Sequence, residues 1–253
     1  MKFIRYQYGS DRPRYGWIYQ DRVGPVEGDP FNEYRRLEVD IPLSDVALLA
    51  PVLPGKIICV GRNYVEHARE HEAPVPEWPM LFLKPPSSVI GPNDAIHLPP
   101  QSEQVEHEVE LAVVIGKTAR WIQPEDAYLH IFGYTVGNDV TARDLQRRDG
   151  QWTRSKGFDT FCPLGPWIET DLDASDVLLS CRVNGELRQM SSTREMVFTV
   201  QQLVAFVSSI MTLVPGDVIL TGTPAGVGPM DEGDSVECTA EGIGTLTNRI
   251  AHR

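Results

Sequence analysis

Short apolar segments with the two-residue period of β-strands dominate this chain and restrict its fold more than any other feature. The clearest is VEHEVELAVVIG at residues 105–116, which begins with strict alternation of side-chain type. Helical spacing is rare, and its best example is TVQQLVAFVSSI, which starts with a Thr199-x-x-Gln202 capping box. Few short helices among many strands, without regular β-α-β-α alternation, indicate an α+β, β-rich fold rather than a doubly wound sheet.

A change in pattern early in the chain predicts two domains. Short strand-like runs such as Tyr15–Tyr19 are first separated by Gly, Pro and Asp turn signals. Pro51 and Pro54 then bracket an expected linker, and longer apolar strands follow it. We therefore expect a small N-terminal β-rich domain at residues 1–52 and a larger main domain at residues 55–253.

The charge balance of the chain argues against partners with strongly anionic surfaces. Lys and Arg total 23 against 35 Asp and Glu, giving a net charge of −12 at neutral pH, so we expect no nucleic-acid and no membrane partner. No stretch approaches the ~20 apolar residues of a membrane helix, and charged residues interrupt the N-terminal segment. Four scattered cysteines without a Cys-x-x-Cys pair are typical of reduced thiols, and we expect a cytoplasmic protein.

The acidic strand at residues 105–116 carries the first candidate metal ligands. Alternate residues of a strand share a face, so Glu106, Glu108 and Glu110 point one way. At ~3.3 Å per residue the Cα atoms of Glu108 and Glu110 lie ~6.6 Å apart, which lets both carboxylates contact one cation. A hard divalent ion such as Mg²⁺ prefers oxygen ligands and cancels their repulsion. An edge strand with a solvated acidic face is the alternative for this segment.

A third carboxylate stands where another apolar strand ends. Asp139 in GNDVTARD lies near the end of the strand expected from Tyr134 to Val140, and a helix is expected directly afterwards. Thr141 and Asp144 have capping-box spacing at this helix start. A metal ligand and a helix cap are both open interpretations of Asp139, because Asp often caps helix N-termini.

Four motifs in order carry a family resemblance. HEVELAVVIGK, GYTVGNDVTARDLQ, RSKGFDTFCPLGP and LVPGDVILTGTPAGVGP together resemble the fumarylacetoacetate hydrolase superfamily from about residue 55 to residue 250. The nearest branch contains acylpyruvate hydrolases, oxaloacetate decarboxylases and hydroxyheptadienedioate isomerases. The resemblance implies a catalytic domain whose mixed sheets form a rolled β-sandwich with a few short helices, and it implies a homodimer. It also implies that Glu108, Glu110 and Asp139 hold Mg²⁺ or Mn²⁺.

The GRNYVEHARE segment supplies candidate catalytic residues. His67 and Glu70 are three residues apart and share one face of the expected short helix. A carboxylate beside imidazole makes it a competent base near neutral pH. The resemblance places the pair on a lid helix, where His67 activates a water and Glu70 supports it; an exposed helix with a solvated pair is the alternative. His71 completes no His-Glu-x-x-His motif and lacks a third ligand, so we expect no zinc site.

Four further polar residues are candidates for contacting the substrate. Arg143 and Gln146 are three apart on the helix after Asp139, Lys156 precedes a glycine, and Thr223 lies in the GTPAGVG turn. By resemblance, these residues bind the substrate carboxylate and the oxygen that gains negative charge, with Lys156 counted as catalytic. Arg suits a carboxylate because its planar fork donates two parallel hydrogen bonds. A surface salt bridge for Arg143 and a solvated loop charge for Lys156 are the alternatives.

Together these residues predict a divalent-metal-dependent enzyme that acts on a small 2-oxo acid through a metal-stabilised enolate. We expect a hydrolase or decarboxylase that cleaves a C–C bond of an acylpyruvate or of oxaloacetate, because His67 and Glu70 suit the activation of water. One alternative is an isomerase of the 2-hydroxyhepta-2,4-diene-1,7-dioate type, in which only a proton moves. Another is a catalytically silent metal-binding homologue, against which the complete residue set counts.

Overall fold

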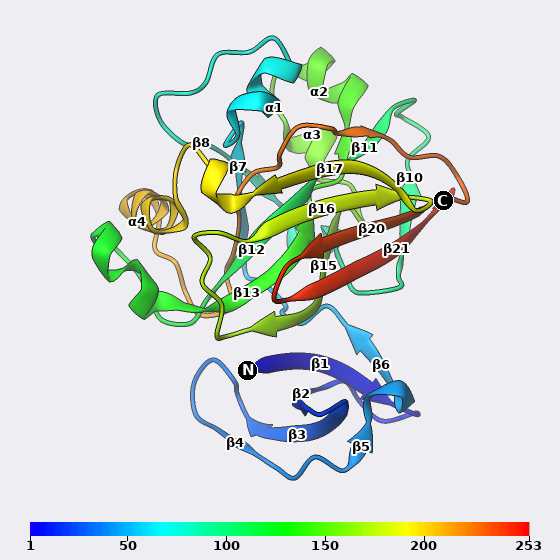
Figure 1. Ribbon diagram of the computed structural model, residues 1–253, viewed down its shortest axis with the longest axis vertical. Helices are drawn as coiled ribbons and strands as arrows, with labels where there is room; N and C mark the ends of the chain where they lie inside the picture. The colour runs from blue at the N-terminus through cyan, green and yellow to red at the C-terminus, as the bar shows by residue number, and fades with distance from the viewer. Residues whose placement is uncertain (253) are drawn as a thin grey trace.

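The computed structural model describes residues 1–252, and its N-terminal part consists of short antiparallel strands. These strands are β1 (Lys2–Tyr8), β2 (Arg14–Tyr19), β3 (Arg22–Gly28), β4 (Tyr34–Arg36), β5 (Ile41–Pro42) and β6 (Val46–Leu49). They lie together at one end of the molecule (Figure 1), around a small core of Ile4, Tyr6 and Val23. The division into residues 1–52 and 55–253 stays a prediction; the sheet itself continues across it, because β1 also pairs with a strand of the main part.

A mixed sheet of 13 strands runs through the molecule. Its remaining strands are β7 (Ile57–Gly61), β8 (Met80–Lys84), β9 (Val89–Ile90), β12 (Val109–Ile115), β13 (Ile131–Asn138), β15 (Cys162–Glu169) and β18 (Val218–Leu220). The order β1-β15-β13-β12-β18-β7-β8 makes β12 an interior strand that is buried on both faces. Leu111 and Val113 pack into the larger core, whereas Ala112 and Val114 pack into a second core on the other face.

A five-stranded sheet packs against the large sheet and completes the expected β-rich sandwich (Figure 1). It contains β10 (Ala95–Leu98), β16 (Leu178–Val183), β17 (Glu186–Ser192), β20 (Ser235–Ala240) and β21 (Gly244–His252). Leu179 and Val236 of this sheet share the larger core with Leu111 and Val113. A third, small sheet consists of β11 (Val105–His107), β14 (Thr141–Ala142) and β19 (Gly228–Pro229).

The helices are short, and α1, α2 and α3 gather at the end of the molecule opposite the N-terminal strands (Figure 1). The α-helices are α1 (Val65–Glu70), α2 (Arg143–Asp149), α3 (Thr153–Lys156) and α4 (Val200–Ile210). Single 3-10 turns cover Leu43–Asp45, Pro86–Ser88, Pro124–His130 and Thr193–Glu195. Within residues 1–252, no helix has both the length and the apolar character needed to cross a membrane.

The capping box predicted at Thr199 is present at the start of α4. The Thr199 N–H donates to Gln202 Oε1 at 2.9 Å, and the Gln202 N–H donates to Thr199 Oγ1 at 3.4 Å. Leu203 and Val207 are fully buried on the inner face of this helix, as the spacing predicted.

The capping box predicted at Thr141 and Asp144 is absent, because no side chain caps α2, which begins at Arg143. The Thr141 hydroxyl instead lies 3.0 Å from Glu108 Oε1 and 2.8 Å from the carbonyl oxygen of Asp139. The preceding strand also ends earlier than expected, before Asp139. Local spacing was misleading here because the carboxylate of Glu108, which is distant in sequence, and the backbone carbonyl of Asp139 are the partners of this hydroxyl.

We expect Thr199→Ala to lower the free energy of unfolding by about 1 kcal/mol, because the first turn of α4 loses its acceptor. Urea unfolding followed by circular dichroism measures the change. Gln201→Ala is the control, since Gln201 is exposed on the same turn and caps nothing; its effect should stay below about 0.5 kcal/mol. Equal losses in the two variants would contradict the role of the cap.

Candidate metal centre and active site

A break in the acidic strand at Glu108 brings distant carboxylates together. β11 ends before this residue and β12 begins after it, so the continuous strand predicted at residues 105–116 is wrong at this position. The Glu108 N–H donates to Asn138 Oδ1 at 2.9 Å, and the Glu108 carbonyl accepts the N–H of Asp139 at 2.9 Å. These bonds fasten the start of β12 to the end of β13, where Asp139 follows.

Glu108, Glu110 and Asp139 form a buried carboxylate triad. Their ligand oxygens all lie within 4.8 Å of one another, and the residues are only 3%, 1% and 1% exposed. A solvated acidic edge is therefore excluded for Glu108 and Glu110. Burial, followed by the charges of Asp139 and Glu108, raises the pKa of Glu110 well above its ordinary value. Three adjacent carboxylates repel one another when all are ionised, and a hard divalent cation such as Mg²⁺ or Mn²⁺ binds oxygen ligands and removes this repulsion.

Two buried lysines contact the triad. Lys156 Nζ donates to Glu108 Oε2 at 2.8 Å and to Asp139 Oδ2 at 2.6 Å, so Lys156 is not a solvated loop charge. Lys84 Nζ donates to Asp139 Oδ1 at 2.5 Å and is fully buried at the end of β8. Burial alone would raise the pKa of Glu108, but Lys156 and Arg143 outweigh burial and lower it. Lys84 was not predicted as a site residue, because the sequence shows only that this lysine ends the apolar run MLFLK.

Arg143 is buried against acidic side chains rather than placed at the surface. Its Nε donates to Glu106 Oε2 at 2.7 Å, and its Nη2 donates to Glu108 Oε1 at 2.5 Å. Its Nη1 donates to Gln146 Oε1 at 2.6 Å, so the two predicted substrate-binding residues of α2 bind each other. Glu106 thus pairs with Arg143 and stands outside the metal triad, although strand alternation put it on the same face.

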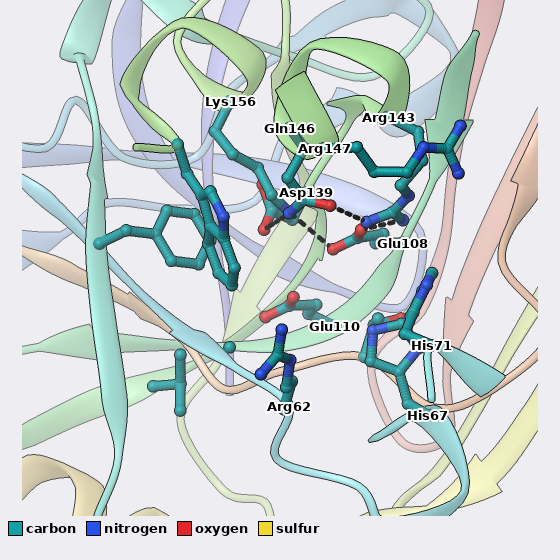
Figure 2. A pocket seen from close by; sticks show the side chains of 15 residues that line it. Arg62, His67, His71, Glu108, Glu110, Asp139, Arg143, Gln146, Arg147 and Lys156 are labelled. Carbon is teal, nitrogen blue, oxygen red and sulfur yellow. Dashed lines mark hydrogen bonds and ion pairs between the residues drawn. The ribbon is translucent and has the colours of Figure 1, made fainter. Parts of the chain in front are cut away.

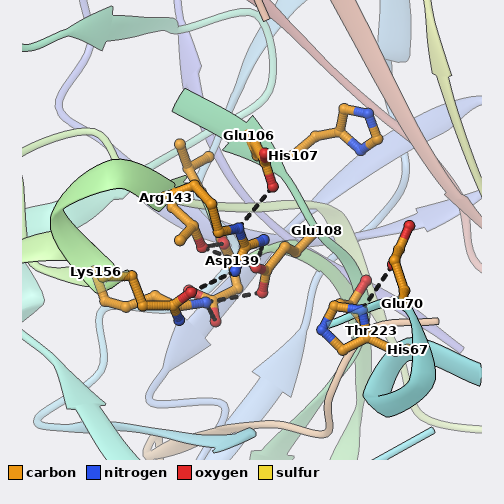
Figure 3. A network of polar contacts seen from close by, with 12 residues as sticks. His67, Glu70, Glu106, His107, Glu108, Asp139, Arg143, Lys156 and Thr223 are labelled. Carbon is orange, nitrogen blue, oxygen red and sulfur yellow. Dashed lines mark hydrogen bonds and ion pairs between the residues drawn. The ribbon is translucent and has the colours of Figure 1, made fainter. Parts of the chain in front are cut away.

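The predicted His67–Glu70 pair is present on α1. His67 Nδ1 lies 3.2 Å from Glu70 Oε2, and Glu70 Oε1 accepts the N–H of Gly226 at 3.1 Å (Figure 3). Although burial opposes it, the hydrogen bonds of His67 and Gly226 lower the pKa of Glu70. His67 is 5% exposed, so the solvated-pair alternative does not describe it. His71 packs edge-on against His67, with ring centroids 4.7 Å apart. Ligand atoms of His67, Glu70 and His71 all lie within 4.8 Å of one another, so the expectation that the two histidines lack a third ligand is wrong.

The glycine-rich turn after β18 closes tightly over the triad. The Gly222 N–H donates to Glu110 Oε2 at 2.6 Å, and a Cβ at Gly222 would lie 2.6 Å from Asn63 Cβ. The Thr223 hydroxyl donates to the carbonyl of Val109 at 2.8 Å and accepts from Gln189 Nε2 at 2.7 Å. Thr223 is therefore held in place by two strands. Gln189 lies on β17, far away in sequence, and no sequence signal pointed to it.

One cavity of about 210 Å³ collects these groups (Figure 2). All the predicted site residues except Glu70 line it: His67, Glu108, Glu110, Asp139, Arg143, Gln146, Lys156 and Thr223. Seven further lining residues were not predicted as parts of the site: Val60, Gly61, Arg62, His71, Phe82, Arg147 and Trp152. The roles of the predicted residues in binding and catalysis stay predictions, but their convergence on one cavity is an observation.

Comparison with known proteins gives a consistent family assignment. Residues 56–251 match the family described as fumarylacetoacetate (FAA) hydrolase C-terminal, and residues 1–51 match the one described as Rv2993c-like, N-terminal. The human oxaloacetate tautomerase FAHD2B, mitochondrial, is 50% identical over 223 residues, which cover 83% of this chain and 71% of the human one.

Two solved structures superimpose over essentially the whole chain. The 5-carboxymethyl-2-hydroxymuconate delta-isomerase from Mycobacterium smegmatis has a TM-score of 0.94 at 48% identity, covering 100% of both chains. The 2-hydroxyhepta-2,4-diene-1,7-dioate isomerase from Mycobacterium marinum has a TM-score of 0.93 at 44% identity, covering 100% of this chain and 99% of that one. Agreement in sequence, fold and motif order leaves one conclusion: the chain belongs to the fumarylacetoacetate hydrolase superfamily.

Proposed function

We propose that this protein is a divalent-metal-dependent enzyme that moves a proton within a small 2-oxo acid, interconverting the keto and enol forms of a substrate such as oxaloacetate. The observation that carries the proposal is the buried triad Glu108, Glu110 and Asp139 in the wall of a small cavity that His67 also lines. The names of the compared proteins, a tautomerase and two isomerases, support proton transfer over bond cleavage.

The charges around the triad explain why a cation and an anionic substrate bind together. The triad and Glu106 provide four buried carboxylates, and they contact three buried cations, Lys84, Lys156 and Arg143. The raised pKa of Glu110 means that its ionisation is favoured only when a cation is bound. With all four carboxylates ionised and a divalent cation bound, the cluster would carry a net positive charge that attracts an anionic substrate. When bound, the cation supplies Lewis-acid polarisation of the substrate keto oxygen.

His67 is the residue that moves the proton in this proposal. Its Nδ1 lies 3.2 Å from Glu70 Oε2, and in the tautomer that donates Nδ1–H to this carboxylate, Nε2 is free to accept a proton. A neutral imidazole with Nε2 free is a competent acceptor for a proton from the carbon next to the keto group. Glu70 is in turn fixed by the N–H of Gly226, which holds the pair in one orientation.

Lys156 is better suited than Thr223 to stabilise the oxygen that gains charge. The ammonium group of Lys156 has three N–H bonds, of which two are used by Glu108 and Asp139, so one is left for the substrate. The single hydroxyl proton of Thr223 is already donated to the carbonyl of Val109. Thr223 therefore shapes the cavity, while Lys156 places positive charge where negative charge develops.

Hydrolysis or decarboxylation of a 2-oxo acid is the second candidate function. Hydrolysis is favoured by the His67–Glu70 pair, because a base at this position is equally able to activate water; decarboxylation needs no water and depends on the metal triad alone. Phe82 and Trp152 form an apolar part of the cavity wall and contact each other edge-on with ring centroids 5.1 Å apart. The names of the compared proteins favour proton transfer over either reaction.

We expect the protein with Mn²⁺ to accelerate the decay of enol oxaloacetate, followed by its ultraviolet absorbance, and chelator to remove this effect. His67→Gln should slow the reaction by about 10²- to 10⁴-fold, because Gln supplies no base. His97→Gln is the matched control, since His97 lies on β10 outside the cavity, and its rate should equal that of the unmodified protein.

The same samples separate proton transfer from cleavage. Total oxaloacetate, measured by enzymatic reduction with NADH, should stay constant while the enol absorbance falls. A parallel loss of total oxaloacetate would assign a decarboxylase, and metal-dependent loss of acetylpyruvate would assign a hydrolase. Metal binding without turnover of either compound would favour the silent homologue.

We expect Mn²⁺ to raise the melting temperature, and Glu110→Gln to abolish most of that rise, because one of three charged ligands is lost. At a concentration of 100 times Kd, the stabilisation of the unmodified protein should be about 2.7 kcal/mol. Glu106→Gln is the matched control: it removes a carboxylate four residues earlier that pairs with Arg143 and is not part of the triad. It should lower stability without metal yet keep the Mn²⁺ response, and equal losses of that response would overturn the triad assignment.

A further inference from the structure

Among residues 1–252, the cavity contains one cationic side chain, Arg62, that makes no hydrogen bond or ion pair. Arg143 and Lys156 are paired with carboxylates, and Arg147 donates to the side chain of Gln104. Arg62 also lines the cavity, but it makes no hydrogen bond or ion pair with any residue in the part of the chain that the structure describes. An unpaired guanidinium in a small cavity beside buried carboxylates is unusual, because Arg in such places is normally hydrogen-bonded.

The backbone of Arg62 is held rigidly in place. Asn63 is fully buried, and its Nδ2 donates to the carbonyls of Phe198 at 3.0 Å and Thr221 at 2.8 Å. Its Oδ1 accepts the N–H of Phe198 at 2.8 Å. Arg62 itself has a φ of +59°, a left-handed conformation that non-glycine residues adopt only where surrounding contacts impose it. The residue is thus fixed at a strained turn between β7 and α1.

The residue before Arg62 brings the aromatic wall of the cavity close to this turn. A Cβ at Gly61 would lie 2.8 Å from the Trp152 ring and 2.9 Å from Met80, so the indole packs directly on the backbone. Figure 2 shows the Arg62 side chain reaching toward Glu110, with Lys156 and Arg143 beyond the carboxylates. The guanidinium and the metal triad therefore face the same small space without forming an ion pair within 4.0 Å.

We propose that Arg62 binds the second carboxylate of a dicarboxylate substrate, and so selects 2-oxo diacids over 2-oxo monoacids. The inference rests on the proposed function, in which the 2-oxo acid end of the substrate lies at the triad. The far carboxylate then needs a cation with a free fork of two parallel N–H groups. Arg62 provides one on the cavity wall, at a position that the backbone fixes.

Arg143, which the family resemblance suggested for a carboxylate, cannot offer such a fork. Its Nε, Nη1 and Nη2 each donate to a side chain of the protein, namely Glu106, Gln146 and Glu108. Both bidentate edges of the guanidinium are thereby partly occupied. Arg143 orients the metal ligand Glu108, and Arg62 is left to recognise the substrate.

The test compares ligands that differ only in the far carboxylate. Malate and 2-hydroxybutyrate are stable 2-hydroxy acids of equal chain length, and only malate carries the second carboxylate. Calorimetric titration in the presence of Mn²⁺ should show malate binding at least about tenfold more tightly. Arg62→Gln should raise the Kd of malate by about 10- to 100-fold, the range expected for the loss of charge-assisted hydrogen bonds. It should change the Kd of 2-hydroxybutyrate by less than about threefold. Arg62→Lys should give an intermediate loss, because it keeps the charge but not the fork.

Arg147→Gln is the matched control, since it removes the same charge from the same cavity but leaves Arg62 in place. It should affect malate and 2-hydroxybutyrate equally and weakly. The proposal is overturned if Arg62→Gln weakens both ligands alike, which would place Arg62 at the metal centre, or weakens neither. It is also overturned if Arg147→Gln weakens malate binding selectively to the same degree, because the summed positive charge of the cavity would then explain the preference.

Kinetic measurements also compare substrates with and without a second carboxylate. With oxaloacetate and 2-oxobutyrate as substrates, exchange of the C3 protons in D₂O measures proton transfer for both. Arg62→Gln should raise KM for oxaloacetate with a smaller change in kcat, and should leave both constants for 2-oxobutyrate unchanged. Absence of exchange in the unmodified protein would reject the proposed function alone, because the binding of malate still decides the role of Arg62.

Discussion

A buried cluster of opposite charges is the interaction on which the rest of this structure depends. Carboxylates from the ends of β12 and β13 meet inside the protein, where isolated negative charge is strongly disfavoured. Lys84 from β8, Lys156 from α3 and Arg143 from α2 each donate to them. Separate strands and helices are therefore tied to one point, and removing any of these cations leaves an uncompensated buried charge.

The basic residues of the site fall into two groups, those that pair with the carboxylates of the cluster and Arg62, which does not. Those that neutralise ligands, such as Arg143, have few hydrogen atoms left to donate, whereas Arg62 is held by its backbone and keeps its donors free. Asn63 fixes the turn that carries Arg62, because its side chain donates hydrogen bonds to the carbonyls of Phe198 and Thr221. The α1 helix with His67 follows directly, so the placement of α1 and of the Arg62 side chain has a common structural cause.

Much of the fold and the core of the site were predictable from local pattern. Period-two alternation made Glu108 and Glu110 candidate ligands, and the end of an apolar strand made Asp139 one, because both signals depend on neighbours in sequence. The family resemblance was needed to choose a metal triad over a solvated edge and a helix cap. The cap at Thr199 was equally local. Lys84 was not predictable, since its meaning depends on a contact 55 residues away that no local pattern encodes. For the same reason strand alternation could not separate Glu106, which has its own arginine, from the true triad.

The reaction is harder to read than the site, because several reactions share the same first requirement. A buried triad that binds a cation prepares any 2-oxo acid for enolate chemistry, and His67 Nε2 accepts a proton from carbon or from water alike. The outcome then depends on what reaches Nε2. Phe82 and Trp152 contact each other on the cavity wall, and Arg62 lines the same cavity. In the proposed function, selectivity among these reactions depends on this wall, where the sequence motifs are least informative.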